Sequence, residues 1–386
     1  MKLIRASLLS LLGFVLLSGP VMLSAAEPSP AAALKPFVEN GSLAGAVTAV
    51  ATKEKLVSLE SVGFMDVTAK QAMRHDCIFW IASMSKPITG VGLMILVDEG
   101  KVSLDDPIEK FLPEFKNLWV TAEQDAEHVL LKKPSRLITV RDVMSHTSGM
   151  PFKSALETPT LDGLPLKDAV RSYAMTPLMH QPGTKYAYSN AGINTGARII
   201  EVVTGQSYED FMDQRLFKPL GMKDTTFWPN EEQVSRLAKP YKPSADKTKL
   251  EETTIGQLTY PLSRRDNRYP MPAGGLFSTA TDCATICRMV LNGGELNGKR
   301  YLSEAAIKAM TSKQTGDAVK DGYGVGWSAN GATFGHGGAL STNMSIDAQR
   351  GIITVFLVQH AGFPGEGNKS QGAFVKAAQD IYGTAK

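Results

Sequence analysis

FWIASMSKPITG, residues 79–90, joins an apolar run to a helical pattern of Val, Leu, Ile and Met. Ser83 stands three residues before Lys86, and residues three apart lie on one face of an α-helix. A helix N-terminus offers unpaired N–H groups and a positive dipole end, which help to keep a lysine neutral and to stabilise an oxyanion. A serine hydroxyl is a weak nucleophile until a base takes its proton. We therefore expect Ser83 to be a nucleophile and Lys86 its base. The alternative is a buried helix start, and Ser85 is interpreted as a helix-end hydroxyl.

A second S-x-x-K pattern, Ser244 to Lys247, serves as an internal control. It follows Pro243 in a Lys/Pro-rich segment, and no apolar helical pattern comes after it. Such a segment is typical of a polar surface loop. Apolar residues flank Ser83 and Lys86 on both sides, so only this first pair is expected in the core.

Two further motifs carry polar groups that could join this pair. Tyr188-Ser189-Asn190 is the only Y-x-N in the chain, on a turn introduced by Pro182 and Gly183. His336-Gly337-Gly338 is expected immediately before a strand that begins near Ala339. The motifs lie so far apart along the chain that only the fold can bring them together.

Three tripeptides resemble these motifs and are set aside. Lys320-Asp321-Gly322 precedes YGVGW and is interpreted as the turn entering that strand. His360-Ala361-Gly362 ends an apolar strand that no further strand follows, and Ser341-Thr342-Asn343 comes after the third motif, out of order.

The apolar patterning predicts an α+β fold. Residues 44–66 indicate two strands joined by a polar turn at 52–55, and strands recur in 323–330, 339–351 and 351–360, before a last helix in 370–383. Between the ends, helical spacing recurs in 87–99, 165–174, 191–203 and 208–216. We predict an antiparallel sheet built from N- and C-terminal strands and flanked by helices. A single catalytic domain would cover 27–386, with its α/β part in about 27–75 and 315–386 and a mostly helical insert in about 76–314.

The order S-x-x-K, Y-x-N, H-x-G resembles the serine β-lactamase and penicillin-binding-protein superfamily, in its class C-like branch. That branch includes class C β-lactamases, D,D-carboxypeptidases, D-aminopeptidases and family VIII carboxylesterases. Supporting stretches span roughly residues 30–385: DDPIEKFLPEF (105–115), ITVRDVMSHTSGMP (138–151), FKPLGMKDT (217–225), PAGGLFSTATD (272–282) and YGVGW (323–327). The resemblance implies a β-lactamase/transpeptidase-like fold.

The resemblance also implies a role for each motif. Ser83 would form an acyl-enzyme, Lys86 would take and relay its proton, and Tyr188 would be the second acid/base hydroxyl. Asn190 would position Lys86 and the substrate, and the amides of Ser83 and Ala339 would form the oxyanion hole beside Gly338. His336 stands where many relatives carry lysine. Because imidazole titrates near neutrality, we expect weaker anchoring of a substrate carboxylate.

Other conspicuous side chains have plainer interpretations. In the resembled family His146 belongs to a structural turn, with Thr147 and Ser148, that bonds local backbone. Large aromatic residues are more often core than pocket lining, although some could line an acyl pocket: Trp80, Trp228, Trp327 and Phe152. Cys283 and Cys287 stand four apart in a predicted helix and are expected to fill a buried stripe. No motif indicates a metal or a cofactor, and we expect none.

Residues 1–26 have the layout of a secretory signal peptide: Lys2 and Arg5, an apolar run, then Ser24-Ala25-Ala26. Gly and Pro interrupt this run, which favours a cleaved signal over a membrane anchor. We therefore expect a periplasmic or secreted protein with no stable membrane span after cleavage. The net charge of +3 does not favour nucleic acid as a partner.

The motifs leave three functions open. The first is a serine hydrolase that acts on small carboxylic esters. The second is hydrolysis of D-alanyl peptides or β-lactams, by a D,D-carboxypeptidase, a D-aminopeptidase or a weak β-lactamase. The third, from a different class, is a penicillin-recognising protein that is acylated but turns over slowly. In each case the partner is a small-molecule ester, peptide or β-lactam.

Overall fold

A computed structural model describes residues 29–317, 319–320 and 322–384. The predicted signal peptide, residues 1–26, lies outside them. Among the described residues, no helix combines the length and apolar character that crossing a bilayer requires.

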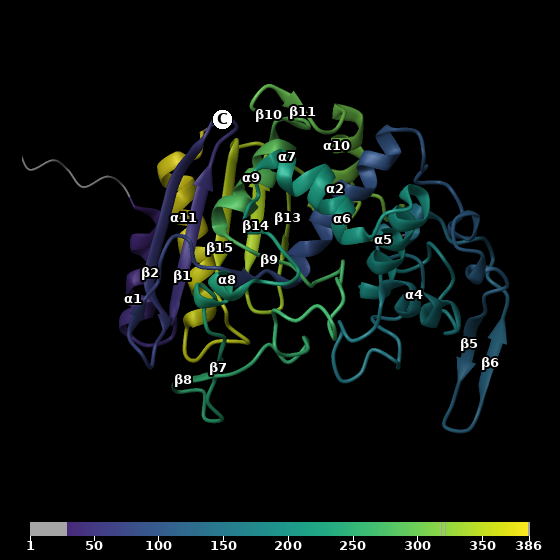
Figure 1. The fold of residues 1–386 in the computed structure, drawn as a ribbon, viewed down its shortest axis with the longest axis horizontal. Coiled ribbons are helices and arrows are strands. Elements are labelled where there is room, and N and C mark those ends of the chain that lie inside the picture. Colours follow the sequence, from purple (N-terminus) through teal and green to yellow (C-terminus); the bar gives the residue numbers. More distant parts are fainter. Residues whose placement is uncertain (1–28, 318, 321, 385–386) are drawn as a thin grey trace, which may run out of the picture.

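A seven-stranded sheet joins the two ends of the chain (Figure 1). All its neighbouring strands are antiparallel, in the order β12 (Ser328–Asn330), β13 (Thr333–Gly337), β14 (Asn343–Asp347), β15 (Ile352–Leu357), β1 (Gly45–Ala51), β2 (Leu56–Asp66) and β3 (Gln71–Ala72). The N- and C-terminal parts meet where β1 pairs with β15, with Val47 opposite Leu357. The predicted α+β fold, with a sheet built from both ends, is confirmed.

The central strand β1 is buried along its whole length, which explains its almost unbroken apolar sequence GAVTAVA. Successive side chains point to opposite faces of a sheet. Val47 and Ala49 accordingly join the main core, which also contains Cys283 and Cys287 of α9 (Ala280–Leu291). On the other face, Ala46 and Val50 pack with α11 (Ser370–Tyr382) and with the N-terminal turns η1 (Pro30–Leu34) and α1 (Lys35–Glu39). The sheet is thus covered on both faces.

The region between the sheet's two halves carries most of the helices, joined by long loops and short strands, and it lies beside the sheet in Figure 1. Its helices are α2 (Ser85–Asp98), α3 (Val140–Met144), α4 (Leu166–Ala174), α5 (Asn190–Thr204), α6 (Tyr208–Met212), α7 (Lys218–Leu220), α8 (Glu231–Ser235), α9 and α10 (Glu304–Thr311). The four helices predicted from spacing correspond to α2, α4, α5 and α6, and the last of these continues as a π-helical turn, Asp213–Phe217.

Several short strands were not predicted. Four two-stranded sheets lie in the helical region: β4 (Phe79–Trp80) with β9 (Phe277–Ser278), β5 (Val120–Gln124) with β6 (Val129–Lys132), β7 (Tyr241–Pro243) with β8 (Leu250–Glu252), and β10 (Glu295–Leu296) with β11 (Lys299–Arg300). The strand expected in 339–351 is β14, but it begins at Asn343 and not near Ala339, and β13, which ends with His336 and Gly337, was not predicted. Because β13 has the glycine-rich sequence TFGHG, it lacks the alternating apolar residues by which a strand is recognised.

The close approach of α2 to the segment before β12 depends on Gly90. A Cβ atom added there would lie 2.2 Å from the carbonyl oxygen of Val325, a backbone atom that cannot move away alone. We expect Gly90→Ala to lower the free energy of unfolding by about 1–3 kcal/mol through overpacking. Chemical denaturation with urea measures this change.

Gly372→Ala in α11 is the matched control, because no atom lies within 4 Å of its added Cβ. It should leave stability unchanged or raise it by up to about 1 kcal/mol, since alanine favours a helix. Equal destabilisation by both substitutions would contradict the packing account.

Candidate active site

Ser83 lies in a 3-10 turn, Ala82–Met84, that leads directly into α2. Ala82 adopts a φ of +46°, which is unusual for a residue other than glycine and marks local backbone strain at the turn. Ser83 is half-buried, whereas Lys86 on the first turn of α2 is completely buried. The turn therefore presents the hydroxyl of Ser83 at the edge of the core, above the lysine.

The amine of Lys86 contacts two oxygens. Its Nζ lies 3.0 Å from the Oγ of Ser83 and donates to the carbonyl oxygen of Ala273 at 2.7 Å. Burial lowers the pKa of Lys86 well below its usual value, because the charged form loses its hydration. A neutral amine keeps a lone pair that can accept the proton of Ser83 while an N–H remains on Ala273. This arrangement can activate a serine.

Tyr188 stands next to this pair. The Nζ of Lys86 lies 4.6 Å from the centroid of its ring. Burial raises the pKa of Tyr188, and hydrogen bonding to Ser83 partly opposes that rise. Its side chain is therefore a protonated phenol beside Ser83, suited to passing a proton rather than holding a charge. The next residue, Ser189, caps α5 by accepting a hydrogen bond from the N–H of Gly192, and this fixes the turn.

Asn190 begins α5 and is buried. Its Oδ1 has no hydrogen-bond partner among the described residues. The bonds of the Lys86 amine go to Ser83 and Ala273, so the positioning of Lys86 by Asn190 stays a prediction. A buried carbonyl oxygen without a partner is unfavourable and is open to a substrate N–H.

His336 differs from the near-neutral imidazole that we expected. Its Nδ1 lies 2.6 Å from the carbonyl oxygen of Gly337 and must donate to it, since a carbonyl only accepts. Its Nε2 lies 2.9 Å from the hydroxyl of Tyr323. Burial lowers the pKa of His336 well below its usual value, because the charged ring would lose its hydration. The third motif therefore supplies a neutral ring, whose centroid lies 6.0 Å from that of Tyr188.

Gly338 brings the end of β13 against the Ser83 turn. A Cβ added to Gly338 would lie 2.5 Å from the carbonyl oxygen of Ile81 and 3.3 Å from the Cβ of Ala82. Only glycine permits this approach, which carries the following residue, Ala339, toward Ser83. Within the described part of the chain, the amide of Ala339 donates no hydrogen bond. The two amides named as an oxyanion hole thus come from neighbouring turns.

His146 has a connection that the sequence did not reveal. Thr147 and Ser148 do bond nearby groups, as expected of a structural turn. The Nδ1 of His146, however, accepts a hydrogen bond at 3.1 Å from the N–H of Ser189, and its carbonyl accepts one at 2.8 Å from Ala187. Its ring centroid lies 4.5 Å from that of Tyr188. His146 therefore holds the backbone on both sides of Tyr188.

A cavity of about 610 Å³ opens beside these residues. Its lining includes Tyr188 and His336 together with Tyr186, Lys320, Gly322, Tyr323, Ser328, Asn330 and Gly337. Lys320 was set aside as part of a turn, because nothing in the local pattern indicates that this turn faces the third motif. Phe152 is 43% exposed and stacks on Tyr188, whereas Trp80, Trp228 and Trp327 are buried. Of the four aromatic residues considered for an acyl pocket, Phe152 thus lies beside the site.

The remaining lookalikes lie apart from this chemistry. Ser244 hydrogen-bonds Asp246 in its own loop. His360 accepts a hydrogen bond from the N–H of Ala44. Ser85 donates to the carbonyl of Ala82 and accepts from the N–H of Leu276, so it holds the start of α2.

The contacts of His146 predict a positioning role. We expect His146→Ala to lower kcat about 10- to 100-fold, because a small displacement of Tyr188 misaligns proton transfer. His146→Asn should retain most activity: its amide oxygen can accept from Ser189, and asparagine tolerates the φ of +62° found here. Steady-state kinetics and thermal unfolding of both variants check this. Equal loss of kcat in both would contradict the role.

Known proteins are similar to this chain over most of its length. A model of the Beta-lactamase family matches residues 31–376. An uncharacterized protein of Mycobacterium tuberculosis, MT1414, is 29% identical over 362 residues, which cover 85% of this chain and 89% of that protein. A Salmonella agona protein named "Putative D-alanyl-D-alanine carboxypeptidase" is 26% identical over 303 residues, covering 70% of this chain and 66% of that protein.

Solved structures show the same fold. EstCE1, titled a hydrolase with promiscuous acyltransferase activity, is similar with a TM-score of 0.75 at 21% identity, over 92% of this chain and 97% of its own. A mutant of simvastatin synthase from Aspergillus terreus is similar with a TM-score of 0.76 at 20% identity, over 95% and 99% of the two chains. The resemblance of the motifs, the fold and the match over residues 31–376 agree: this chain belongs to the Beta-lactamase family, whose members are serine hydrolases.

Proposed function

We propose that this protein is an exported serine hydrolase that forms an acyl-enzyme on Ser83 and acts as a carboxylesterase on small esters. The observation that carries the proposal is the buried amine of Lys86 at 3.0 Å from the Oγ of Ser83. Export rests on the signal-like residues 1–26. Recovery of the protein from the cytoplasm, with residues 1–26 still attached, would contradict export.

The contacts suggest a sequence of proton transfers. Lys86 Nζ takes the proton of Ser83 as Oγ bonds to the ester carbonyl carbon. The amides of Ser83 and Ala339 receive the resulting oxyanion. Tyr188 then hands a proton to the leaving alkoxide as the ester C–O bond breaks, and it recovers a proton from the ammonium of Lys86. In deacylation, a water molecule gives up a proton as its oxygen bonds to the acyl carbon. The bond from that carbon to the Oγ of Ser83 then breaks, Oγ takes up a proton, and the acid is released.

The neutral His336 favours an ester over a substrate that must be held by its carboxylate. A carboxylate is bound most strongly by a charged donor. The ring of His336 carries no charge at neutral pH and is occupied by Gly337 and Tyr323. Ester hydrolysis needs the nucleophile, the base and the oxyanion hole, but no cation to hold a substrate carboxylate.

Lys320 favours a second candidate, hydrolysis of a substrate with a free carboxylate. Its side chain lines the same cavity as Tyr188 and His336 and could supply the charge that His336 lacks. A relative named as a D-alanyl-D-alanine carboxypeptidase is consistent with this candidate. It includes D-alanyl carboxypeptidase, D-aminopeptidase and weak β-lactamase activity. A slow-turnover penicillin-recognising protein would use the same cation.

A substrate panel tests the nucleophile and the preferred class together. We expect turnover of p-nitrophenyl acetate and butyrate to exceed that of a D-Ala-D-Ala peptide and of a chromogenic cephalosporin. Ser83→Ala should lower ester turnover at least about 10³-fold, because loss of a nucleophile removes the covalent route. Ser244→Ala, in the second S-x-x-K pattern, is the control and should leave ester turnover unchanged. Ester turnover that survives in Ser83→Ala would overturn the mechanism, and lasting labelling by fluorescent penicillin without turnover would favour the penicillin-recognising protein.

Lys320→Ala separates the two candidates. It should leave kcat/KM for the neutral esters within about twofold, while raising KM for any substrate that carries a carboxylate, because only the latter needs the cation. Lys313→Ala is the matched control, because Lys313 also lies between α10 and β12 but does not line the cavity. It should change neither activity. A peptide activity that exceeds the ester activity and depends on Lys320 would replace the esterase proposal by the second candidate.

A further inference from the structure

The β5–β6 hairpin projects from the helical region, at the lower right of Figure 1. Its two strands pair antiparallel, with Gln124 opposite Val129 near the turn. The outer edge of β5 is covered at its base, where Thr121 and Trp119 exchange hydrogen bonds with Leu178. Within the described ranges, no strand pairs with the outer edge of β6. That edge therefore presents backbone groups that another strand could bind.

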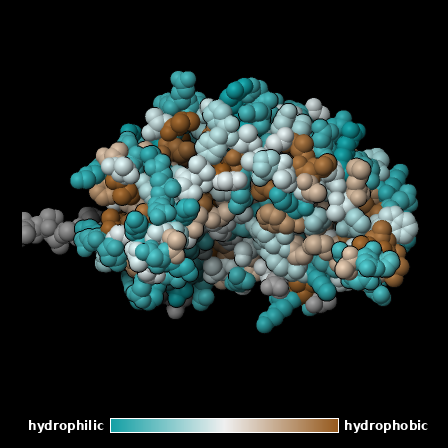
Figure 2. Space-filling model, turned by 90° about the horizontal axis from the view of Figure 1, so that it is seen from below, coloured by the Kyte–Doolittle hydropathy of each residue, from teal (hydrophilic) through white to brown (hydrophobic). Residues whose placement is uncertain are grey.

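Large apolar side chains gather on this exposed hairpin. Val129 is 52% exposed, Leu130 56% and Leu131 37%, and they occupy three of the four positions of β6. Trp119 and Leu137 at its base are also exposed. Figure 2 shows hydrophobic side chains gathered at the same end of the molecule, to the right, among hydrophilic ones. An apolar edge strand is ordinarily protected, so this one indicates a surface that is covered in use.

The two ends of the hairpin carry opposite charges. The turn bears acidic side chains, whereas basic ones surround its base: Asp125 and Glu127 at the turn, with Glu123 next to it in β5, and Lys116, Lys132, Lys133 and Arg136 at the base. Asp142 already holds Arg136 through two hydrogen bonds, at 2.6 and 2.8 Å. Lys133 stacks over Trp119 at 3.8 Å from the ring centroid. Among the described side chains, no carboxylate pairs with Lys116, Lys132 or Lys133, so these three cations are open to an acidic partner.

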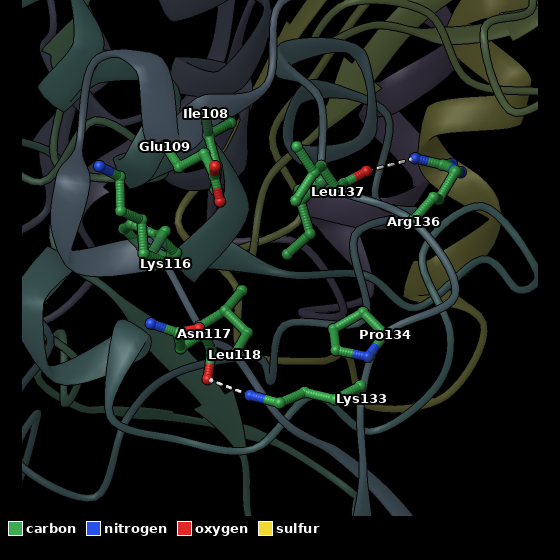
Figure 3. Close-up of a pocket in the computed structure, with 11 residues that line it drawn as sticks. Ile108, Glu109, Lys116, Asn117, Leu118, Lys133, Pro134, Arg136 and Leu137 are labelled. Carbon is green, nitrogen blue, oxygen red and sulfur yellow. Dashed lines mark hydrogen bonds between the residues drawn. The ribbon is translucent and has the colours of Figure 1, made fainter.

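A cavity of about 460 Å³ lies at this base (Figure 3). Its apolar wall includes Leu118, Pro134 and Leu137, which surround the hollow in the view, and Lys133 reaches the carbonyl of Asn117 across its rim. Glu109 is the acidic side chain of the lining. A hollow with an apolar wall and a mainly basic rim fits the tip of an acidic turn.

We propose that the occupant of this surface is a second copy of the chain. The outer β6 edges of the two copies would pair antiparallel about a twofold axis at Leu130. The backbone groups of each edge would then bind those of the other. Glu127 lies just before β6 and Lys133 just after it, each three residues from Leu130, so the antiparallel pair brings Glu127 of each copy toward Lys133 of the other. The acidic turn precedes β6 and the cavity rim follows it, so the antiparallel pair also brings the acidic turn of one copy to the end at which the basic rim of the other lies.

The charge pattern favours a second copy over a lipid surface. Anionic membranes attract clusters of basic residues and repel acidic ones. The tip of this hairpin is acidic, and the tip would be the first part to meet a membrane. Opposite charges at the two ends suit an antiparallel copy of the same hairpin instead.

Light scattering after size-exclusion chromatography tests the proposal on the purified protein over a range of concentrations. We expect a concentration-dependent dimer. Leu130→Glu should be a monomer with unchanged hydrolase turnover, which shows that it is folded. Val234→Glu places the same charge on another exposed apolar position, in α8, and should still dimerise. A wild-type protein that is monomeric at every concentration overturns the proposal.

Charge exchange tests the register. Glu127→Lys and Lys133→Glu should each weaken the dimer at least tenfold, because each places like charges opposite one another. Mixing the two variants should restore a heterodimer, since both facing pairs then have opposite charges. Failure of the mixture to associate overturns this register. A monomer that instead sediments with vesicles of phosphatidylcholine and phosphatidylglycerol would identify a lipid surface as the occupant and overturn the proposal.

Discussion

The contact between the buried amine of Lys86 and the hydroxyl of Ser83 is the constraint on which the site depends. A charged lysine could not be held in this core without a large desolvation cost, so burial itself creates the free lone pair. The carbonyl of Ala273 keeps that amine hydrogen-bonded and aimed at Ser83. Burying Lys86 therefore lowers the stability of the fold, but it provides a base that is already deprotonated.

The rest of the fold brings two further groups to this pair. The turn after β13 packs on Ile81 and Ala82 because Gly338 has no side chain, and it carries the amide of Ala339 with it. The turn before α5 carries Tyr188, whose neighbours His146 binds through both its ring and its carbonyl. Sheet and helices thus meet at one cavity, as expected for a site assembled from distant segments.

The features that could be predicted from the sequence are those that depend on the local spacing of residues. Ser83 and Lys86 stand three apart on one helical start, and the unbroken apolar run of β1 marks a central strand. The sequence did not predict β13, since TFGHGG lacks apolar alternation, or the bond from His146 to Ser189, 43 residues away. The sequence also did not predict the lowered pKa of His336, because its burial is a property of the fold.

The pH dependence of Ser83 acylation tests the central claim most directly, measured as the burst rate with a p-nitrophenyl ester. A protonated lysine cannot accept the proton of Ser83, so the rate should fall as pH drops through the lowered pKa of Lys86. We predict a rate that rises with pH to a plateau well below 10.5, the ordinary value for lysine. A rate that continues to climb until about pH 10.5 would show a charged Lys86 at neutral pH and contradict the account.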